Sequence, residues 1–202
     1  MLVIQNLVLR RGSWQRRYDL QAESAAIITI QGRSGAGKSA LLAAIAGFEP
    51  VAAGDIQWQG QSLLSLPIEQ RPVSMLFQEH NLFEHLSVAQ NLKLGLKFAS
   101  EATQQTALQQ ATEALEITAY LRKMPQELSG GQRQRVALLR TILRPEPIIL
   151  LDEPFAELDA YTREIAAQWV RATAKAAHKT VLLVTHQNED VERLADHNVI
   201  FE

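Results

Sequence analysis

A glycine-rich octapeptide places the tightest constraint on how this chain of 202 residues folds. The segment Gly32–Ser39 reads GRSGAGKS and matches the pattern G-x-x-x-x-G-K-[ST], between the apolar run Ala25–Ile30 and a helical stretch, Lys38–Ala46. Glycines let such a loop wrap closely around phosphates, and N–H groups at the helix N-terminus point at anionic oxygens. Lys38 is placed to reach the β- and γ-phosphates, and the Ser39 hydroxyl to ligate Mg²⁺. The alternative, a plain turn, explains less, so we predict a nucleotide site formed by Gly32, Arg33, Ser34, Gly35, Ala36, Gly37, Lys38 and Ser39.

Strand-like runs alternate with helical stretches along the chain. The expected strands are Leu2–Leu9, Ala25–Ile30, Asp55–Trp58, Val73–Phe77, Pro147–Leu151 and Thr180–Val184. This alternation predicts an α/β fold with a largely parallel sheet. One domain is expected over residues 1–202. The stretch of about 81–143 has little strand signal and is expected to form a helical subdomain, with a long helix over Glu101–Arg122.

Composition excludes several classes of protein. Lys and Arg number 20 against 22 Asp and Glu, so the strongly basic charge of a nucleic-acid binder is missing. Cysteine is absent, which removes thiolate metal sites and disulfides. The longest apolar runs fall far short of the roughly 20 residues that cross a bilayer. Any role at a membrane must therefore depend on a partner.

Polar residues follow two of the apolar strands directly. Ile148–Leu151 is followed by Asp152 and Glu153, at the strand end where open α/β sheets bind ligands. Asp152 is expected to hold Mg²⁺, and Glu153 is the better candidate for a general base that polarises water. Thr185 and His186 end the next strand in the same way, so His186 is a candidate for contact with the γ-phosphate or the attacking water. Both have structural alternatives: a turn for the carboxylates, a surface position for His186. The remaining histidines are expected to be structural: His80, His85, His178 and His197.

A second glycine motif precedes the helical run Arg133–Leu143. Leu128–Gln132 reads LSGGQ, which places a serine hydroxyl and two glycine N–H groups at a helix N-terminus, where anions bind. One triphosphate does not need two such sites in one chain. The second site has a purpose if it serves the nucleotide of another copy in a two-fold, head-to-tail dimer. The alternative is an ordinary serine N-cap followed by a turn.

The motifs GRSGAGKS, LSGGQ, ILLDE, LFQE and TH, in this order, resemble an ATP-binding-cassette (ABC) ATPase. The resemblance implies a P-loop core with a mixed sheet, a small antiparallel β subdomain and a helical subdomain that carries the signature. It implies ATP hydrolysis with Mg²⁺ in a homodimer at the cytoplasmic face of a bacterial membrane, bound to permease subunits and indirectly to a substrate-binding protein, without nucleic acid.

The resemblance also implies residue roles. Glu153 is the catalytic base, His186 the switch histidine, and Asp159 a dimer contact. Gln78 contacts Mg²⁺ and the attacking water and couples the site to the membrane subunit. The metal is held by Ser39, Gln78 and Asp152, and the opposite protomer's ATP is contacted by Ser129, Gly130, Gly131 and Gln132.

One position departs from the family pattern. The aromatic residue that stacks on adenine is expected soon after the first strand, where this chain has Arg10, Arg11 and Gly12. Trp14 is our candidate for the stacking residue. Stacking by the Arg11 guanidinium and plain surface packing of Trp14 remain alternatives.

The segment from Arg71 to Asn91 is similar to the ATPase subunit of bacterial thiamine importers. It implies an importer for thiamine or its phosphates; other small-molecule importers or exporters and soluble ABC ATPases are alternatives. A kinase is disfavoured because LSGGQ has no purpose there. Four apolar residues are expected to form either a groove for the permease or the subdomain's own core: Phe77, Leu82, Phe83 and Leu86. The chain ends soon after the strand-like Asn198–Phe201, so no regulatory domain is expected.

Overall fold

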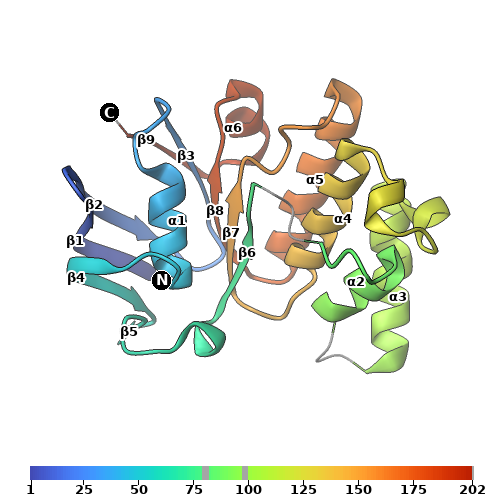
Figure 1. Cartoon of the computed structure of the whole chain (residues 1–202), viewed down its shortest axis with the longest axis horizontal. Helices are drawn as coiled ribbons and strands as arrows, with labels where there is room; N and C mark the ends of the chain where they lie inside the picture. Colours follow the sequence, from blue (N-terminus) through green and yellow to red (C-terminus); the bar gives the residue numbers. More distant parts are fainter. Residues whose placement is uncertain (79–81, 97–99, 202) are drawn as a thin grey trace.

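A computed structural model describes residues 1–78, 82–96 and 100–201. At its centre is a five-stranded parallel sheet in the order β6-β7-β8-β3-β9 (Figure 1). The strands are β3 (Ile27–Gly32), β6 (Val73–Leu76), β7 (Ile148–Asp152), β8 (Thr180–Val184) and β9 (His197–Phe201). Every residue of β7 and β8 is buried, as continuous apolar strands covered on both faces should be.

A second sheet is antiparallel, in the order β2-β1-β4-β5. Its strands are β1 (Leu2–Arg11), β2 (Trp14–Ala22), β4 (Val51–Trp58) and β5 (Gln61–Ser62). The predicted fold class is confirmed, with the two strand directions divided between two sheets. Strand β2 is not among the expected strands, because its buried residues Tyr18, Leu20 and Ala22 alternate with polar ones and form no apolar run.

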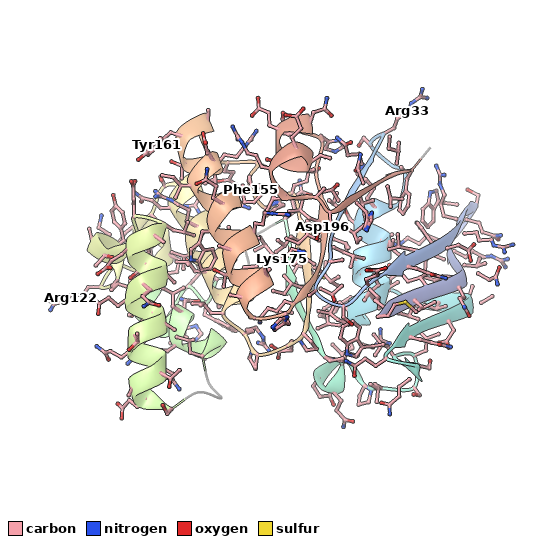
Figure 2. All side chains as sticks on the ribbon, turned by 180° about the vertical axis from the view of Figure 1, so that it is seen from behind. Arg33, Arg122, Phe155, Tyr161, Lys175 and Asp196 are labelled. Carbon is pink, nitrogen blue, oxygen red and sulfur yellow. The ribbon has the colours of Figure 1, made fainter. Side chains whose placement is uncertain are left out.

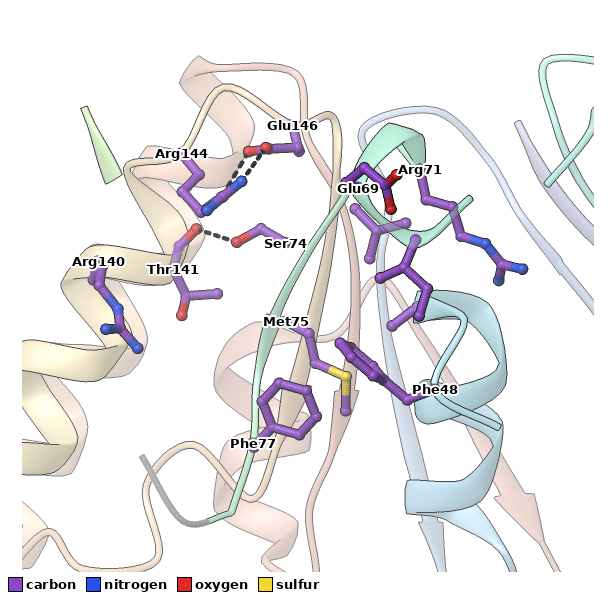
Figure 3. Close-up of a pocket in the computed structure, with 13 residues that line it drawn as sticks. Phe48, Glu69, Arg71, Ser74, Met75, Phe77, Arg140, Thr141, Arg144 and Glu146 are labelled. Carbon is purple, nitrogen blue, oxygen red and sulfur yellow. Dashed lines mark hydrogen bonds and ion pairs between the residues drawn. The ribbon is translucent and has the colours of Figure 1, made fainter. Parts of the chain in front are cut away.

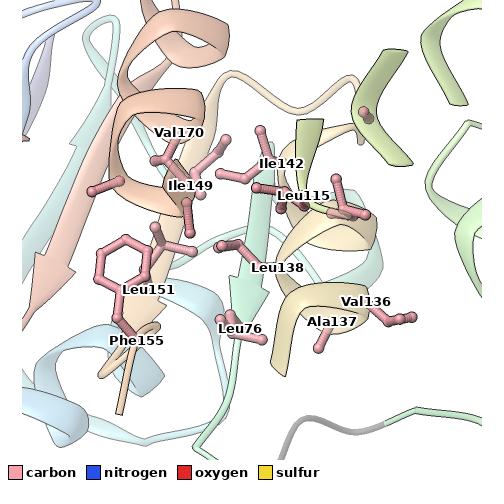
Figure 4. Packing of buried hydrophobic residues seen from close by; sticks show 14 of the residues in the cluster. Leu76, Leu115, Val136, Ala137, Leu138, Ile142, Ile149, Leu151, Phe155 and Val170 are labelled. Atoms are coloured by element: carbon pink, nitrogen blue, oxygen red, sulfur yellow. The ribbon is translucent and has the colours of Figure 1, made fainter. Parts of the chain in front are cut away.

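Helices cover both faces of the parallel sheet. Helix α1 (Lys38–Ala46) lies between the two sheets, whereas α4 (Gly130–Ile142), α5 (Ala160–Ala176) and α6 (Asn188–Leu194) cover the other face. Alternate residues of β7 show this division: Ile148 and Leu150 join the apolar cluster around α1, and Ile149 and Leu151 join the cluster around α4 and α5 (Figure 4). No helix within the described ranges is long and apolar enough to span a membrane.

Short helices connect β6 to α4. They are α2 (Val88–Gly95), α3 (Glu101–Ala114) and the 3-10 turns η2 (Thr118–Tyr120) and η3 (Pro125–Glu127); a further turn, η1 (Ile68–Gln70), precedes β6. The helix expected over 101–122 is shorter than predicted, because Glu116 has a left-handed backbone (φ 53°) that ends the helical path.

A partly exposed ionic contact fixes the start of β3. Asp196 Oδ2 accepts a hydrogen bond from the Ile27 N–H (2.8 Å) and pairs with Lys175 on α5, and Oδ1 accepts from Arg171 (3.1 Å) (Figure 2). The other end of the same strand carries the glycine-rich loop. The contact therefore holds the strand that positions the loop.

Strand register brings the expected site residues to one edge of the sheet. Ile30 and Asp152 are both paired with Val184, and Leu76 is paired with Leu151. Because all these strands are parallel, the segments that follow them leave from the same edge. That edge carries the glycine-rich loop, Gln78, the two carboxylates and His186.

Candidate active site

The glycine-rich loop closes around the ammonium group of Lys38. Lys38 Nζ donates to the carbonyl oxygens of Gly32 (2.8 Å) and Arg33 (2.9 Å), and its side chain is buried. Gly37 has φ 85°, and a Cβ there would overlap the Tyr18 hydroxyl, which donates to the Gly37 carbonyl (3.0 Å). Only glycine fits this position. The Arg33 side chain is exposed and points away from the fold (Figure 2).

Oxygen donors suited to a divalent cation lie beside the lysine. The Ser39 hydroxyl lies close enough to the Asp152 carboxylate to lower its pKa, and Asp152 is 6% exposed. Burial raises the pKa of Asp152, against the opposing effects of Ser39 and Lys38, and burial also lowers the pKa of Lys38. In the described part of the chain, no group of three His, Asp or Glu side chains is arranged to hold a metal ion without further ligands. A hydroxyl and a carboxylate completed by phosphate and water oxygens suit Mg²⁺, which keeps most of its shell from such ligands.

Glu153 and His186 form a pair across two strand ends. His186 Nε2 lies 2.9 Å from Glu153 Oε1, with both side chains partly exposed. Glu153 has a left-handed backbone (φ 48°), its N–H donates to the Val184 carbonyl (3.0 Å), and Gln134 of α4 donates to the next carbonyl, that of Pro154 (2.7 Å). This framework positions the Glu153 carboxylate, with one oxygen engaged by the imidazole and the other able to accept a proton from water.

Most of these residues line one cavity of about 490 Å³, whose described lining does not include Asp152. It therefore brings together the loop, Gln78, Glu153, His186 and the Trp14 side chain, although these positions are up to 172 residues apart in the sequence. Its walls are Arg11, Trp14, Ser34, Gly35, Gly37, Lys38, Ser39, Ala40, Gln78, Glu153 and His186.

Trp14 and Arg11 are placed differently in this cavity. The Trp14 ring also packs against the loop, since a Cβ at Gly37 would lie 2.8 Å from a Trp14 ring atom. The Arg11 guanidinium is engaged by Glu49, with 2.8 Å between Arg11 Nε and Glu49 Oε1. The Arg11 guanidinium holds the pKa of the Glu49 carboxyl below its usual value. Trp14 is therefore the aromatic wall of the cavity, and Arg11 is held by its carboxylate partner.

The LSGGQ residues do not join this cavity. None of residues 129–132 is among the described residues that line it, and Figure 1 shows α1 and α4 on opposite sides of the parallel sheet. Ser129 caps α4: its Oγ accepts from the Gln132 N–H (3.3 Å), and the Ser129 N–H donates to Gln132 Oε1 (2.9 Å). Gly130 lies against Glu157, where a Cβ would overlap the carboxylate. Within one chain this motif is a capped helix start.

Asp159 also caps a helix. It accepts hydrogen bonds from the Thr162 N–H (2.9 Å) and hydroxyl (3.1 Å) at the start of α5, and these bonds lower the pKa of its carboxyl. Its expected role as a dimer contact remains a prediction.

A second cavity of about 280 Å³ lies between the end of α1, β6 and α4 (Figure 3). Phe48, which follows α1 and is 54% exposed, meets Phe77 edge to face with 5.2 Å between ring centroids. Arg140, Glu69 and the Arg144–Glu146 ion pair add charged groups to its lining. The sequence shows Phe48 directly after the glycine that ends α1, but the exposure of its ring and its contact with Phe77 are seen only in the structure.

Of the four expected groove residues, Phe77 alone lines this cavity among the described residues. Leu82 packs against the large core cluster, which favours the core alternative for that residue. Phe83 is exposed and lies 5.5 Å from the Arg140 guanidinium. Buried Asn91 fixes the backbone here by donating to the carbonyls of Phe83 and Leu86 (both 3.0 Å). Residues 79–81 of this segment, including His80, lie outside the described residues.

Residues 16–156 match the protein family described as ABC transporter. The chain belongs to this family. The resemblance seen in the motifs is thus confirmed over most of the chain. As a member of the ABC family, the protein binds ATP and is an ATPase.

Three curated relatives show how far the ABC similarity extends. The thiamine import ATP-binding protein ThiQ of Vibrio vulnificus is 47% identical over 182 residues, covering 89% of this chain and 78% of the relative. ThiQ of Histophilus somni is 48% identical over 178 residues (86% and 82% covered), and ThiQ of Escherichia coli K12 is 44% identical over 186 residues (91% and 80%).

A solved ABC cassette has the same fold. The dimeric structure of MJ0796, a bacterial ABC transporter cassette, superposes with a TM-score of 0.87 at 25% identity, over 100% of this chain and 94% of that one. The dimeric structure of a post-hydrolysis state of MJ0796, bound to ADP and Pi, has the same fold and superposes with the same TM-score of 0.87.

Proposed function

We propose that this ATPase powers a bacterial importer of thiamine or thiamine phosphates. The observation that carries the proposal is the identity of 44–48% to thiamine import ATP-binding proteins over most of both chains. Residues 1–202 then act as one nucleotide-binding domain, in which the stretch of about 81–143 forms the helical subdomain. The protein sits at the cytoplasmic face of the membrane, where it binds permease subunits.

The cavity geometry supports a division of labour in hydrolysis. The loop residues Gly32 to Ser39 hold the phosphates, and Trp14 stacks on adenine. Glu153 accepts a proton from the attacking water while His186, on its other side, orients the carboxylate and contacts the γ-phosphate. Water oxygen bonds to the γ-phosphorus, the bond to the β-γ bridging oxygen breaks, and ADP and phosphate leave.

Mg²⁺ fits the oxygen donors of the site. Ser39 and Asp152 would hold it, with Gln78 reaching it from the loop after β6. When bound, the ion neutralises charge on the phosphates and so favours their displacement. It would also favour the charged form of Asp152, whose pKa is raised by burial.

The signature completes the site of a second copy in this proposal. Ser129, Gly130, Gly131 and Gln132 sit at a helix N-terminus and are not among the described residues that line their own chain's nucleotide cavity. A head-to-tail dimer would bring each signature to the partner's γ-phosphate. ATP binding then closes the dimer, and hydrolysis releases it.

The 280 Å³ cavity is the proposed permease contact. Exposed Phe48 and Ile68 offer apolar surface, and Arg140 and the Arg144–Glu146 ion pair offer charged groups, next to the segment that carries Gln78. A permease helix seated here would sense the position of Gln78 and thus the state of the nucleotide.

Co-purification tests this function. The tagged chain is purified from gently solubilised membranes of its host and assayed for ATPase activity with thiamine and the binding protein. A co-purifying permease and thiamine-stimulated hydrolysis are expected. A permease whose complex ignores thiamine would contradict the cargo, and soluble partners alone would contradict transport.

A further inference from the structure

A third, smaller cavity lies behind the Glu153–His186 pair. It measures about 120 Å³ and shares Glu153 and His186 with the nucleotide cavity. Its other walls come from the loop after β7 and the starts of α5 and α6: Phe155, Ala156, Arg163, Thr185, Gln187 and Asp190. The pair thus forms the wall between a nucleotide cavity and a smaller one.

Asp190 is buried beside this small cavity with one oxygen engaged. The side chain is 2% exposed, and Oδ2 accepts a 2.5 Å hydrogen bond from the hydroxyl of Thr185, itself 3% exposed. The same hydroxyl accepts from the Gln187 N–H (3.1 Å), and the Thr185 N–H donates to the Ile30 carbonyl (3.3 Å). These bonds fix the residues on both sides of His186.

Two polar atoms at this cavity are buried without a partner among the described protein atoms. They are Asp190 Oδ1 and Arg163 Nε; the Arg163 guanidinium is held by one bond to the Phe155 carbonyl (3.1 Å). An unpaired buried carboxylate oxygen is costly, and polar cavities of this size hold ordered water. Burial raises the pKa of Asp190, which agrees with a carboxylate that needs such solvation.

We propose that Asp190 is a positioning residue for hydrolysis. Through Thr185 and a buried water shared with Arg163, it holds His186 at hydrogen-bonding distance from Glu153. This inference rests on the proposed role of the Glu153–His186 pair. It adds a residue on α6 that touches neither nucleotide nor water nucleophile but sets the geometry of the groups that do.

The test is a double-mutant cycle with Asp190→Asn and His186→Ala, read as turnover and as ATP affinity of the purified chain. Asn keeps an acceptor for Thr185 but presents an amide N–H₂ to the Arg163 Nε–H. We expect Asp190→Asn to lower kcat about tenfold or more, since displaced catalytic groups lose rate steeply, with ATP affinity within twofold. In the His186→Ala background the same change should have no further effect.

Controls separate this from a general loss of structure. Glu192→Gln removes a charge from an exposed position on the same helix and should leave both constants unchanged. If Asp190→Asn does not fold, Thr185→Val removes the same hydrogen bond with little change of shape and should show the same loss of kcat alone.

Two results would overturn the inference while leaving the proposed function intact: full turnover in folded Asp190→Asn, or an equal loss in both backgrounds of the cycle. A parallel loss of ATP affinity would also overturn it, because it would show general support of the nucleotide site. Unchanged turnover in His186→Ala would instead refute the proposed role of the pair itself.

Discussion

The N-termini of helices α1 and α4 both offer an anion site, but the two are capped differently. At α1, the N-cap residue Gly37 has a left-handed backbone, no described side chain caps the helix, and Lys38 Nζ donates back to the Gly32 carbonyl of the loop. At α4, Ser129 and Gln132 satisfy each other in a capping box. The first end is built to receive phosphate within one chain. The N-terminus of α4 is already capped by side chains of its own helix, and it can serve as half of an interface between two copies.

The largest expected effect comes from the catalytic carboxylate on the α1 side. Glu153→Gln removes the proton acceptor but keeps the shape, so turnover should fall about 100-fold or more while ATP still binds. The ATP-bound dimer should then accumulate in size-exclusion chromatography. Glu164→Gln, an exposed change on α5, is the control. Substantial turnover by Glu153→Gln would contradict the assignment of the base.

Substitutions in the 280 Å³ cavity, the proposed permease contact, should change permease binding without changing ATP hydrolysis at either helix N-terminus. Phe48→Asp places a charge on an exposed apolar side chain, so permease binding should weaken about tenfold or more while the basal ATPase rate stays within twofold. Ile200→Asp, at another exposed apolar position, should leave both unchanged. Normal assembly of Phe48→Asp with the permease, measured by co-purification, would contradict the proposal that the 280 Å³ cavity is the permease contact.

A smaller effect is expected at the adenine end of the cavity. Trp14→Ala removes an aromatic wall, and losing a stacking interaction of about 1 kcal/mol should weaken ATP binding about fivefold. Trp14→Phe keeps a ring and should retain most of the affinity. Unchanged binding of a fluorescent ATP analogue by Trp14→Ala would favour the plain packing alternative.

The smallest expected effect is a gain in stability at Asp152. Its raised pKa means that the folded state binds more protons than the unfolded state between the ordinary and the raised value, so stability falls as pH rises through that window. In EDTA at pH 7, Asp152→Asn should therefore raise Tm, by about 2 °C or more, and the gain should shrink toward pH 4. A lower Tm at pH 7 would show that the Asp152 carboxylate stabilises the nucleotide-free fold.

The parts of the fold that follow from the sequence are those with dense local signals. The apolar runs that become β3, β7 and β8 are visible because both faces of these strands are buried, and the helix at Lys38–Ala46 is bounded by the loop before it and Gly47 after it. Strand β2 is not visible in this way, because its alternation is masked by arginines, and its sheet neighbours depend on contacts distant in sequence.

The functional residues likewise include some that the sequence predicts and some that only the structure shows. Motifs and spacing predict the loop, Asp152, Glu153 and His186, since each follows a strand that ends at one edge. Asp190 and Phe48 could not be predicted, because their significance depends on their surroundings. Asp190 has a buried carboxylate oxygen without a described partner, and Phe48 meets the ring of Phe77, which follows β6.

Mixing two inactive variants tests the difference between the two helix ends most directly. Lys38→Ala disables the loop at α1. Ser129→Asp keeps an N-cap at α4 but repels phosphate from it. Each variant alone should be inactive. If the loop of one copy works with the signature of the other, heterodimers contain one intact site, and an equal mixture should regain ATPase activity from about a quarter of the sites. Activity no higher than that of the separate variants would contradict the account.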